Sequence, residues 1–117
     1  MSLLEELKDL GTNVSEGLER VMGDSSLYEM MLGMFISSVQ ENPVSLEDFD
    51  GGDQEDLIRR VHTLKGITGN LAITPLFNGY TEVLGLLRGG DAQTAKKQFE
   101  QVLTVQEKVI DCINRYA

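Results

Sequence analysis

Apolar residues recur at intervals of three or four along most of the chain, which is the spacing of one face of an α-helix. Glycine, proline and capping residues interrupt this pattern at several points. No β-hairpin or βαβ pattern appears. The sequence therefore predicts an all-α fold: an antiparallel four-helix bundle with one or two short extra helices at the N-terminus.

The first 23 residues are expected to form the short helices. Gly11 interrupts an amphipathic first helix. Its apolar residues share one face: Leu3, Leu7, Leu10 and Val14. A second short helix is expected from Ser15 to Met22, with Gly23 ending it.

Residues 24–117 are expected to form the bundle core of the same single domain, 1–117. Its first helix runs from a cap at residues 24–26 to about Glu41, before Pro43. The stripe assigned to the core is Leu27, Met30, Met31, Met34 and Phe35, so the methionines are interpreted as core residues. A second apolar stripe is Tyr28, Leu32, Ile36 and Val39. The N-terminal helix is expected to cover this second stripe, and a partner protein is the alternative.

Three further helices are expected after one capped turn at residues 45–48. Asp53 caps a helix that runs to about Gly69, and Asp91 caps the helix that ends the chain. Between them, Thr74 is expected to be the N-cap, with Pro75 at the first helical position. The core faces of the three helices are Leu57, Val61, Leu64, Thr68 and Leu71; Leu76, Tyr80, Val83, Leu84 and Leu87; and Ala95, Phe99, Val102, Val109, Ile110 and Ile113.

Length and charge exclude several classes of protein. At 117 residues the chain suits one domain and is too short for most two-domain enzymes. With 10 basic and 19 acidic residues, its net charge of −9 would repel nucleic acid. The chain has no apolar run of about 20 residues, so no membrane contact is expected. The N-terminus lacks the pattern of a secretory signal, and a cytoplasmic location is expected.

Single copies of cysteine and histidine limit the possible chemistry. Cys112 leaves no intramolecular disulfide and no cysteine-rich zinc site, and it is expected in the core. A metal site at His62, the only histidine, would need carboxylates from elsewhere in the chain. At about 100° per residue, His62 lies roughly 140° from the centre of the core face of its helix, so it is expected to face solvent.

The neighbours of His62 point to a reactive histidine rather than an incidental one. Lys65, Gly66 and Gly69 lie near it, at i+3, i+4 and i+7. Glycine inside a helix costs about 0.5–1 kcal/mol relative to alanine. Gly66 would let another molecule approach the ring, whereas for Gly69 approach and close helix packing both stay open. Lys65 could neutralise an incoming phosphate. An exposed neutral imidazole is a competent nucleophile, but no nucleotide-binding loop is present, so a partner must supply the donor.

The run His62-Thr63-Leu64-Lys65-Gly66, followed by Gly69-Asn70-Leu71, resembles the signature of histidine-containing phosphotransfer (HPt) domains. The resemblance covers nearly the whole chain. Upstream it includes Gly17-Leu18-Glu19-Arg20, Gly23-Asp24, Leu27-Tyr28 and Phe35, and downstream Leu76, Tyr80, Leu84 and Arg88-Gly89-Gly90-Asp91. Three positions depart from the usual family pattern: Ile67, Ala72 and Leu84.

The resemblance implies a carrier in a phosphorelay. His62 would be the phosphorylated residue, Lys65 would stabilise the phosphate charge, and Gly66 and Gly69 would give clearance. The partners would be response-regulator receiver domains, which supply both the reacting aspartates and Mg²⁺, and the chain would need no cofactor of its own. It would have no kinase activity, although a longer parent could be a hybrid sensor kinase, acting in cis or in trans. A monomer is expected.

The sequence leaves two alternative functions. A non-catalytic helical adaptor could bind receiver or other signalling domains without phosphotransfer. The dimerisation domain of a histidine kinase is disfavoured, because Thr63 stands where an acidic residue usually follows the histidine and no proline occurs before Pro75.

Overall fold

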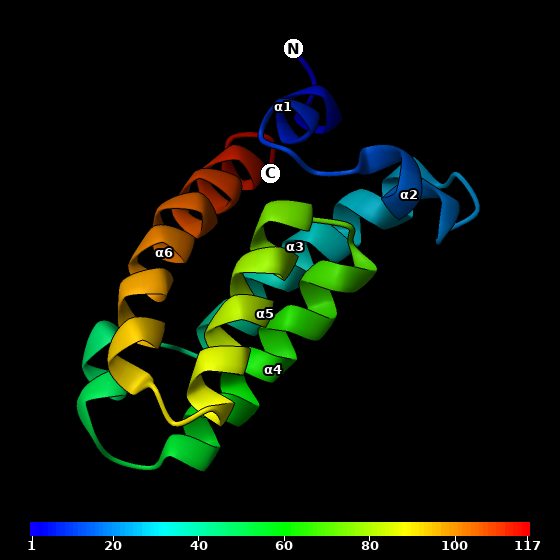
Figure 1. Ribbon diagram of the computed structural model, residues 1–117. Helices are drawn as coiled ribbons and strands as arrows, with labels where there is room; N and C mark the ends of the chain where they lie inside the picture. Colours follow the sequence, from blue (N-terminus) through cyan, green and yellow to red (C-terminus); the bar gives the residue numbers. More distant parts are fainter.

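The computed structural model describes all 117 residues and contains only helices, which confirms the predicted all-α class. The elements are α1 (Leu3–Asp9), α2 (Val14–Glu19), α3 (Ser25–Glu41), the 3-10 helix η1 (Leu46–Asp50), α4 (Gln54–Asn70), α5 (Thr74–Arg88) and α6 (Ala92–Arg115). The four longest helices lie alongside one another, and α1 lies across the end where both termini emerge (Figure 1). None of the helices has the length and apolar character that crossing a bilayer requires.

Three aspartates start three of the four longest helices; the sequence predicts Asp53 and Asp91 as caps and leaves the first cap open among residues 24–26. Asp24 accepts the backbone N–H of Leu27 at 3.1 Å, and Asp53 accepts that of Asp56 at 3.0 Å. At the start of α6, Asp91 accepts from Thr94 N at 3.1 Å. Each carboxylate satisfies a backbone donor that has no partner inside the helix and lies at the positive end of the helix dipole.

Two predicted helix boundaries are wrong. Helix α2 covers Val14–Glu19 rather than 15–22, and the chain then reverses through Met22 (φ 56°) and Gly23 (φ 79°). At α5 the N-cap is Ile73, whereas Thr74 and Pro75 are already helical. The Thr74 hydroxyl donates back to the carbonyl of Ala72 at 3.3 Å and therefore caps nothing.

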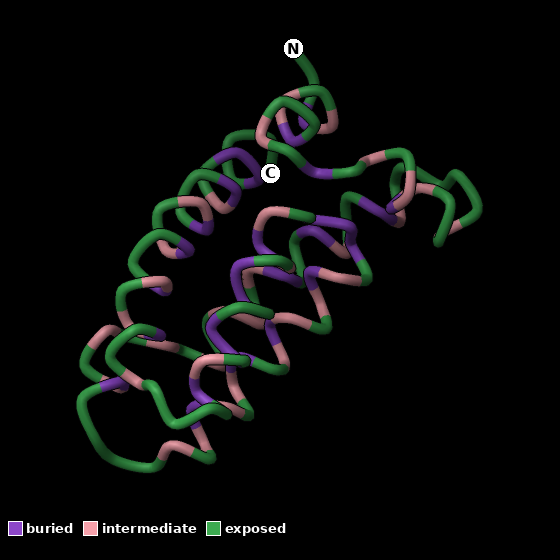
Figure 2. Tube along the Cα trace, viewed as in Figure 1, coloured by how far each residue is buried: buried purple, intermediate pink, exposed green.

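The core lies between α3, α4, α5 and α6 (Figure 2). The predicted core faces of α4 and α5 are fully buried, and on α6 only Ile110 is less than buried. Phe49 of η1 closes one end of this core against Phe99, with 5.3 Å between the ring centroids. Cys112 is buried as expected, and burial raises the pKa of its thiol.

The predicted orientation of α3 is wrong. Its buried residues are Tyr28, Leu32 and Phe35, whereas Met30 and Met34 are 59% and 60% exposed. Both stripes are apolar, so periodicity alone does not distinguish them. The Tyr28 hydroxyl donates to the Leu71 carbonyl at 2.7 Å, and this contact fixes which side faces α4. Met30 and Met34 are therefore not core residues, whereas Met31 is partly buried against the core. The second stripe, which the N-terminal helix is predicted to cover, is instead the side of α3 that joins the core, with Tyr28 and Leu32 buried.

The segment between α3 and α4 is tied to its neighbours by charged side chains. Arg60 donates to the Pro43 carbonyl and pairs with Asp48 and Asp56, at 3.2 and 3.0 Å. The backbone N–H of Ser45, followed by the Arg60 guanidinium, holds the pKa of the Asp48 carboxyl below its usual range. The segment that leads into α4 is therefore anchored to that helix through Arg60.

Candidate functional site

Helix α4 carries the candidate site on the side opposite its core face. Leu57, Val61, Leu64 and Thr68 are buried, and this fixes the rotation of the helix. His62 is exposed, as its angle from that face predicts. The imidazole is therefore accessible to another molecule.

Gly66 lies one turn beyond His62 on the same open side. It is exposed, and a Cβ built at this position would meet no atom within 4 Å. Packing within the domain therefore does not require glycine here. The space that a Gly66 side chain would occupy is empty, which suits the close approach of a second molecule.

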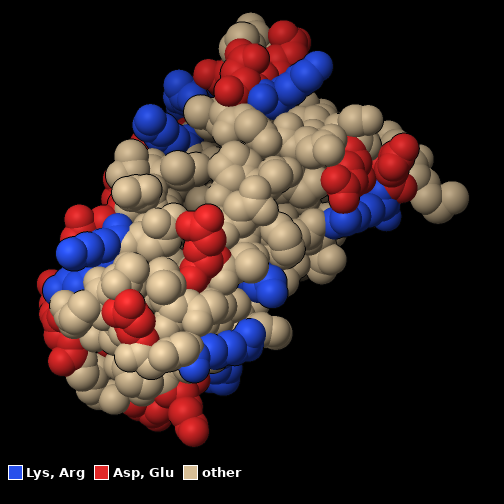
Figure 3. Space-filling model, viewed as in Figure 1, with Lys and Arg blue, Asp and Glu red and all other residues tan.

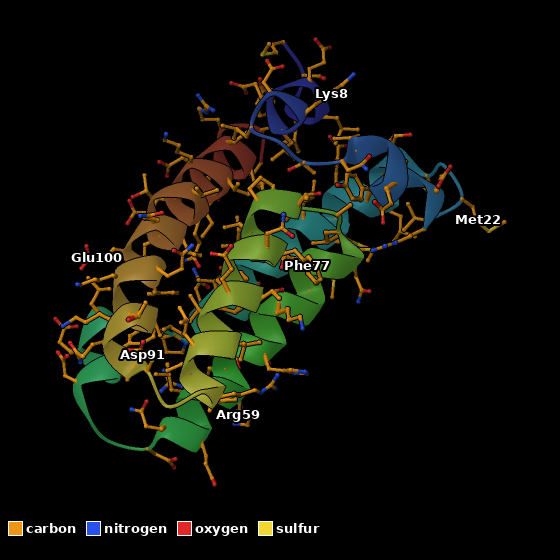
Figure 4. All side chains as sticks on the ribbon, viewed as in Figure 1. Lys8, Met22, Arg59, Phe77, Asp91 and Glu100 are labelled. Atoms are coloured by element: carbon orange, nitrogen blue, oxygen red, sulfur yellow. The ribbon has the colours of Figure 1, made fainter.

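Gly69 has a different environment, which was left open by the sequence. A Cβ at Gly69 would lie 3.0 Å from each of two ring carbons of Phe77. Phe77 belongs to α5 and is half-buried, in the middle of the face seen in Figure 4. The absence of a side chain at Gly69 thus lets the aromatic ring lie against α4, and close packing explains this glycine.

Lys65 is the cation nearest in sequence to His62 that has no carboxylate partner. Its Nζ lies 5.9 Å from the centroid of the Phe77 ring, and it takes part in no ion pair. By contrast, Arg59 and Arg60, which precede the histidine in sequence, both pair with Asp56. The positive charge of Lys65 therefore stays available to an anion at His62.

Three hydrogen bonds fix the C-terminal end of α4. Arg20, the C-cap of α2, donates to the Gly69 carbonyl, and Tyr28 of α3 donates to that of Leu71. The backbone N–H of Asn13 donates to the Ala72 carbonyl at 2.8 Å. Burial raises the pKa of Tyr28 to about 12, so its hydroxyl stays a donor at neutral pH. These bonds hold the helix that carries His62 in a fixed position relative to α2 and α3.

An apolar groove between α3 and α4 is the feature that the sequence did not predict. It is lined by Met31, Met34, Ser38, Ile67, Asn70 and Leu71. The exposed side chain of Met30 lies one helical turn before Met34. The signal in the sequence is that α3 is apolar on two sides: the stripe with Met31 and Met34, which the periodicity assigns to the core, lines this groove instead. Ile67 and Asn70, which line the groove from α4, lie in the two helical turns that follow His62.

Charge is unevenly distributed over the surface. Acidic side chains gather around η1 and the start of α6, while the middle of the visible face is largely uncharged (Figure 3). No group of three or more His, Cys, Asp or Glu side chains is placed to hold a metal ion.

Comparisons with known proteins do not add to this picture. No protein-family model matches the chain, and neither curated proteins nor solved structures give a match. The functional argument therefore depends on the residues themselves.

Proposed function

We propose that this chain is a phosphorelay carrier of the HPt type. His62 accepts a phosphoryl group from the aspartate of one receiver domain and passes it to another. The observation that carries the proposal is the combination on one open helix face: an exposed imidazole, an unpaired lysine one turn on, and a glycine whose absent side chain no packing explains.

The transfer step needs only one imidazole nitrogen from this chain. Its lone pair attacks phosphorus, an N–P bond forms and the P–O bond to the donor aspartate breaks. The carboxylate leaves with the electron pair. The second ring nitrogen keeps its proton, so no base is required at this step. The reverse sequence returns the phosphoryl group to another aspartate.

Lys65 and Gly66 serve this step in different ways. The Lys65 ammonium offsets the charge of the phosphoryl group on His62, one helical turn away. Gly66 leaves room for the receiver surface to reach the ring. Positioning and charge stabilisation dominate catalysis of phosphoryl transfer, so these contributions are enough when the receiver supplies Mg²⁺ and the aspartate.

The fold fits a receiver partner. We infer that α3, α4, α5 and α6 form the antiparallel four-helix bundle that the resemblance implies, with α1 and α2 as the extra helices. The short connections between successive helices support this arrangement. The apolar groove next to α4, with Met34 and Ile67, supports docking of a protein surface beside His62.

The remaining features follow from this role. The carrier acts in the cytoplasm as a monomer, without a cofactor or kinase activity of its own. Joined to a longer chain, the same domain would serve a hybrid sensor kinase.

The proposal is tested by following phosphoryl transfer to the protein. Wild type and His62→Gln are incubated with Mg²⁺ and a panel of radiolabelled phospho-receivers. In parallel they are incubated with phosphoramidate, a small donor that phosphorylates imidazoles. His62 is exposed, so the variant keeps its fold, which circular dichroism checks. Label that is acid-labile, alkali-stable and absent from His62→Gln supports the carrier.

Two outcomes would count against the proposal. Label that persists in His62→Gln places the reaction elsewhere. Folded wild-type protein that stays unlabelled by the whole panel rejects the carrier, and receiver binding without transfer would then favour the non-catalytic adaptor.

A further inference from the structure

We infer that Phe77 is a positioning residue: the face of its ring holds the Lys65 ammonium beside the phosphoryl group that His62 carries. Gly69 makes this contact possible. The inference rests on the proposed phosphotransfer at His62 and assigns roles to two residues on its flank.

The Phe77 ring packs tightly against α4. Phe77 comes from α5, whereas Lys65 and Gly69 lie one turn apart on α4. The Phe77 ring carbons are 3.0 Å from where a Cβ of Gly69 would lie. A Cβ at this position would therefore require the ring to give way by a few tenths of an ångström. This tight fit determines how closely the Phe77 ring approaches α4 and how the ring is oriented.

The Lys65 ammonium lies over this ring. The Lys65 Nζ lies over the ring, 5.9 Å from its centroid, which is within the range of a cation–π interaction. Lys65 is half-buried, as is Phe77, so part of its aliphatic stem is also out of solvent. A free lysine has many rotamers, and contact with a fixed ring reduces their number.

Lys65 contacts an aromatic ring, whereas several other basic residues pair with carboxylates. Five of the other basic residues, Arg20, Arg59, Arg60, Lys96 and Arg115, pair with carboxylates. A carboxylate at Lys65 would compete with phosphate for the ammonium and lower the net positive charge beside His62. An aromatic ring orients the ammonium without neutralising it. Lys65 is therefore restrained by the ring and has no carboxylate partner, one turn after His62 on α4.

The contact itself has a spectroscopic signature that does not depend on activity. In wild type, the Lys65 side-chain protons nearest the ring should resonate upfield, because the ring current shields protons above its face. Phe77→Leu should remove this shift and Phe77→Tyr should keep it. Lys97, which has no aromatic neighbour of this kind, serves as the internal reference. Lysine signals that Phe77→Leu leaves unmoved would overturn the contact.

The functional test uses phosphoramidate, because a small donor reports on the site without receiver docking. Phe77→Leu should slow labelling of His62 by about two- to fivefold, the size expected for an exposed cation–π contact. Phe77→Tyr should restore the wild-type rate. Gly69→Ala should slow labelling less than Phe77→Leu does, since its Cβ requires the ring to give way by only a few tenths of an ångström.

A double-variant cycle separates positioning from general packing. If the ring acts through the lysine, Phe77→Leu should have no further effect in a Lys65→Met background. An equal slowing in both backgrounds, or a wild-type rate for Phe77→Leu, overturns the inference while leaving the carrier intact. Wild-type protein that accepts no phosphoryl group rejects the carrier and this role of the ring together.

Discussion

At the scale of single residues, glycines with similar sequence surroundings have different reasons for being glycine. A Cβ at Gly66 would meet nothing, whereas at Gly17 it would lie 2.6 Å from the Tyr28 ring. The first glycine leaves a surface open and the second lets α2 rest on a buried side chain. The two positions therefore form a matched pair for separating function from stability.

Replacing Gly66 with alanine should leave the fold intact. We expect the free energy of unfolding to stay the same or rise by about 0.5–1 kcal/mol, because alanine favours the helix. Transfer from a receiver should fall, since the added methyl faces the docking partner. Urea denaturation and phosphotransfer assays measure the two effects. Unchanged receiver transfer would remove the clearance role from Gly66.

Replacing Gly17 with alanine should have the opposite outcome. The new methyl would overlap the Tyr28 ring and cost about 1–3 kcal/mol of stability. Transfer measured on the folded fraction should not change, because Gly17 lies on α2 rather than beside His62. Urea denaturation that matches wild type would contradict this packing.

At the scale of elements, α3 shows where sequence periodicity is informative and where it is not. The core faces of α4, α5 and α6 could be predicted because each of these helices has one apolar side. Helix α3 has two, and the choice between them depends on contacts far apart in the chain, such as Tyr28 with Leu71. The exposed His62 could be predicted from its own helix. Phe77 could not, because its ring meets Lys65 and Gly69 only through the packing of α5 on α4.

The exposed face of α3 gives a prediction about binding. Changing Met30 and Met34 together to serine should alter stability by less than about 0.5 kcal/mol, because both are more than half exposed. Receiver affinity should fall by about tenfold, since apolar area would no longer be buried on docking. Isothermal calorimetry with a cognate receiver measures the change. Equal affinities would place docking away from this groove.

The anchored η1 segment gives a prediction about pH. Asp48 has a lowered pKa, so its carboxylate stabilises the fold above its unfolded pKa of about 3.9, and this contribution is lost as the pH falls through the folded value. Asp48→Asn should cost about 1–2 kcal/mol at pH 7. The difference from wild type should shrink below about pH 4. A gap that persists at low pH would exclude a charge effect.

At the scale of the whole molecule, the N-terminal helices belong to the same body as the rest. Leu3 and Leu7 join the core, and Glu6 pairs with Arg115 at 3.2 Å. The Tyr116 hydroxyl donates to the Met1 carbonyl at 2.7 Å. The end of the chain is therefore held by its beginning.

Leu7→Ala tests this union. Leu7 is fully buried, so the substitution should cost about 2–5 kcal/mol of stability and leave one cooperative transition. Tyrosine fluorescence and circular dichroism, followed in the same urea titration, would show whether there is one transition. Two separate transitions would mean that α1 melts independently.

The contact between α1 and α6 joins segments from opposite ends of the chain. The most extensive helix packing joins neighbours in the chain, α4 with α5 and α5 with α6, which need only short loop closures. Docking of α1 on α6 closes a loop of nearly the whole chain and is expected to come last. Weakening it should then accelerate unfolding and leave the refolding rate almost unchanged. We therefore expect the lifetime of the native state to depend on how firmly α1, at the start of the chain, packs on α6 at its end.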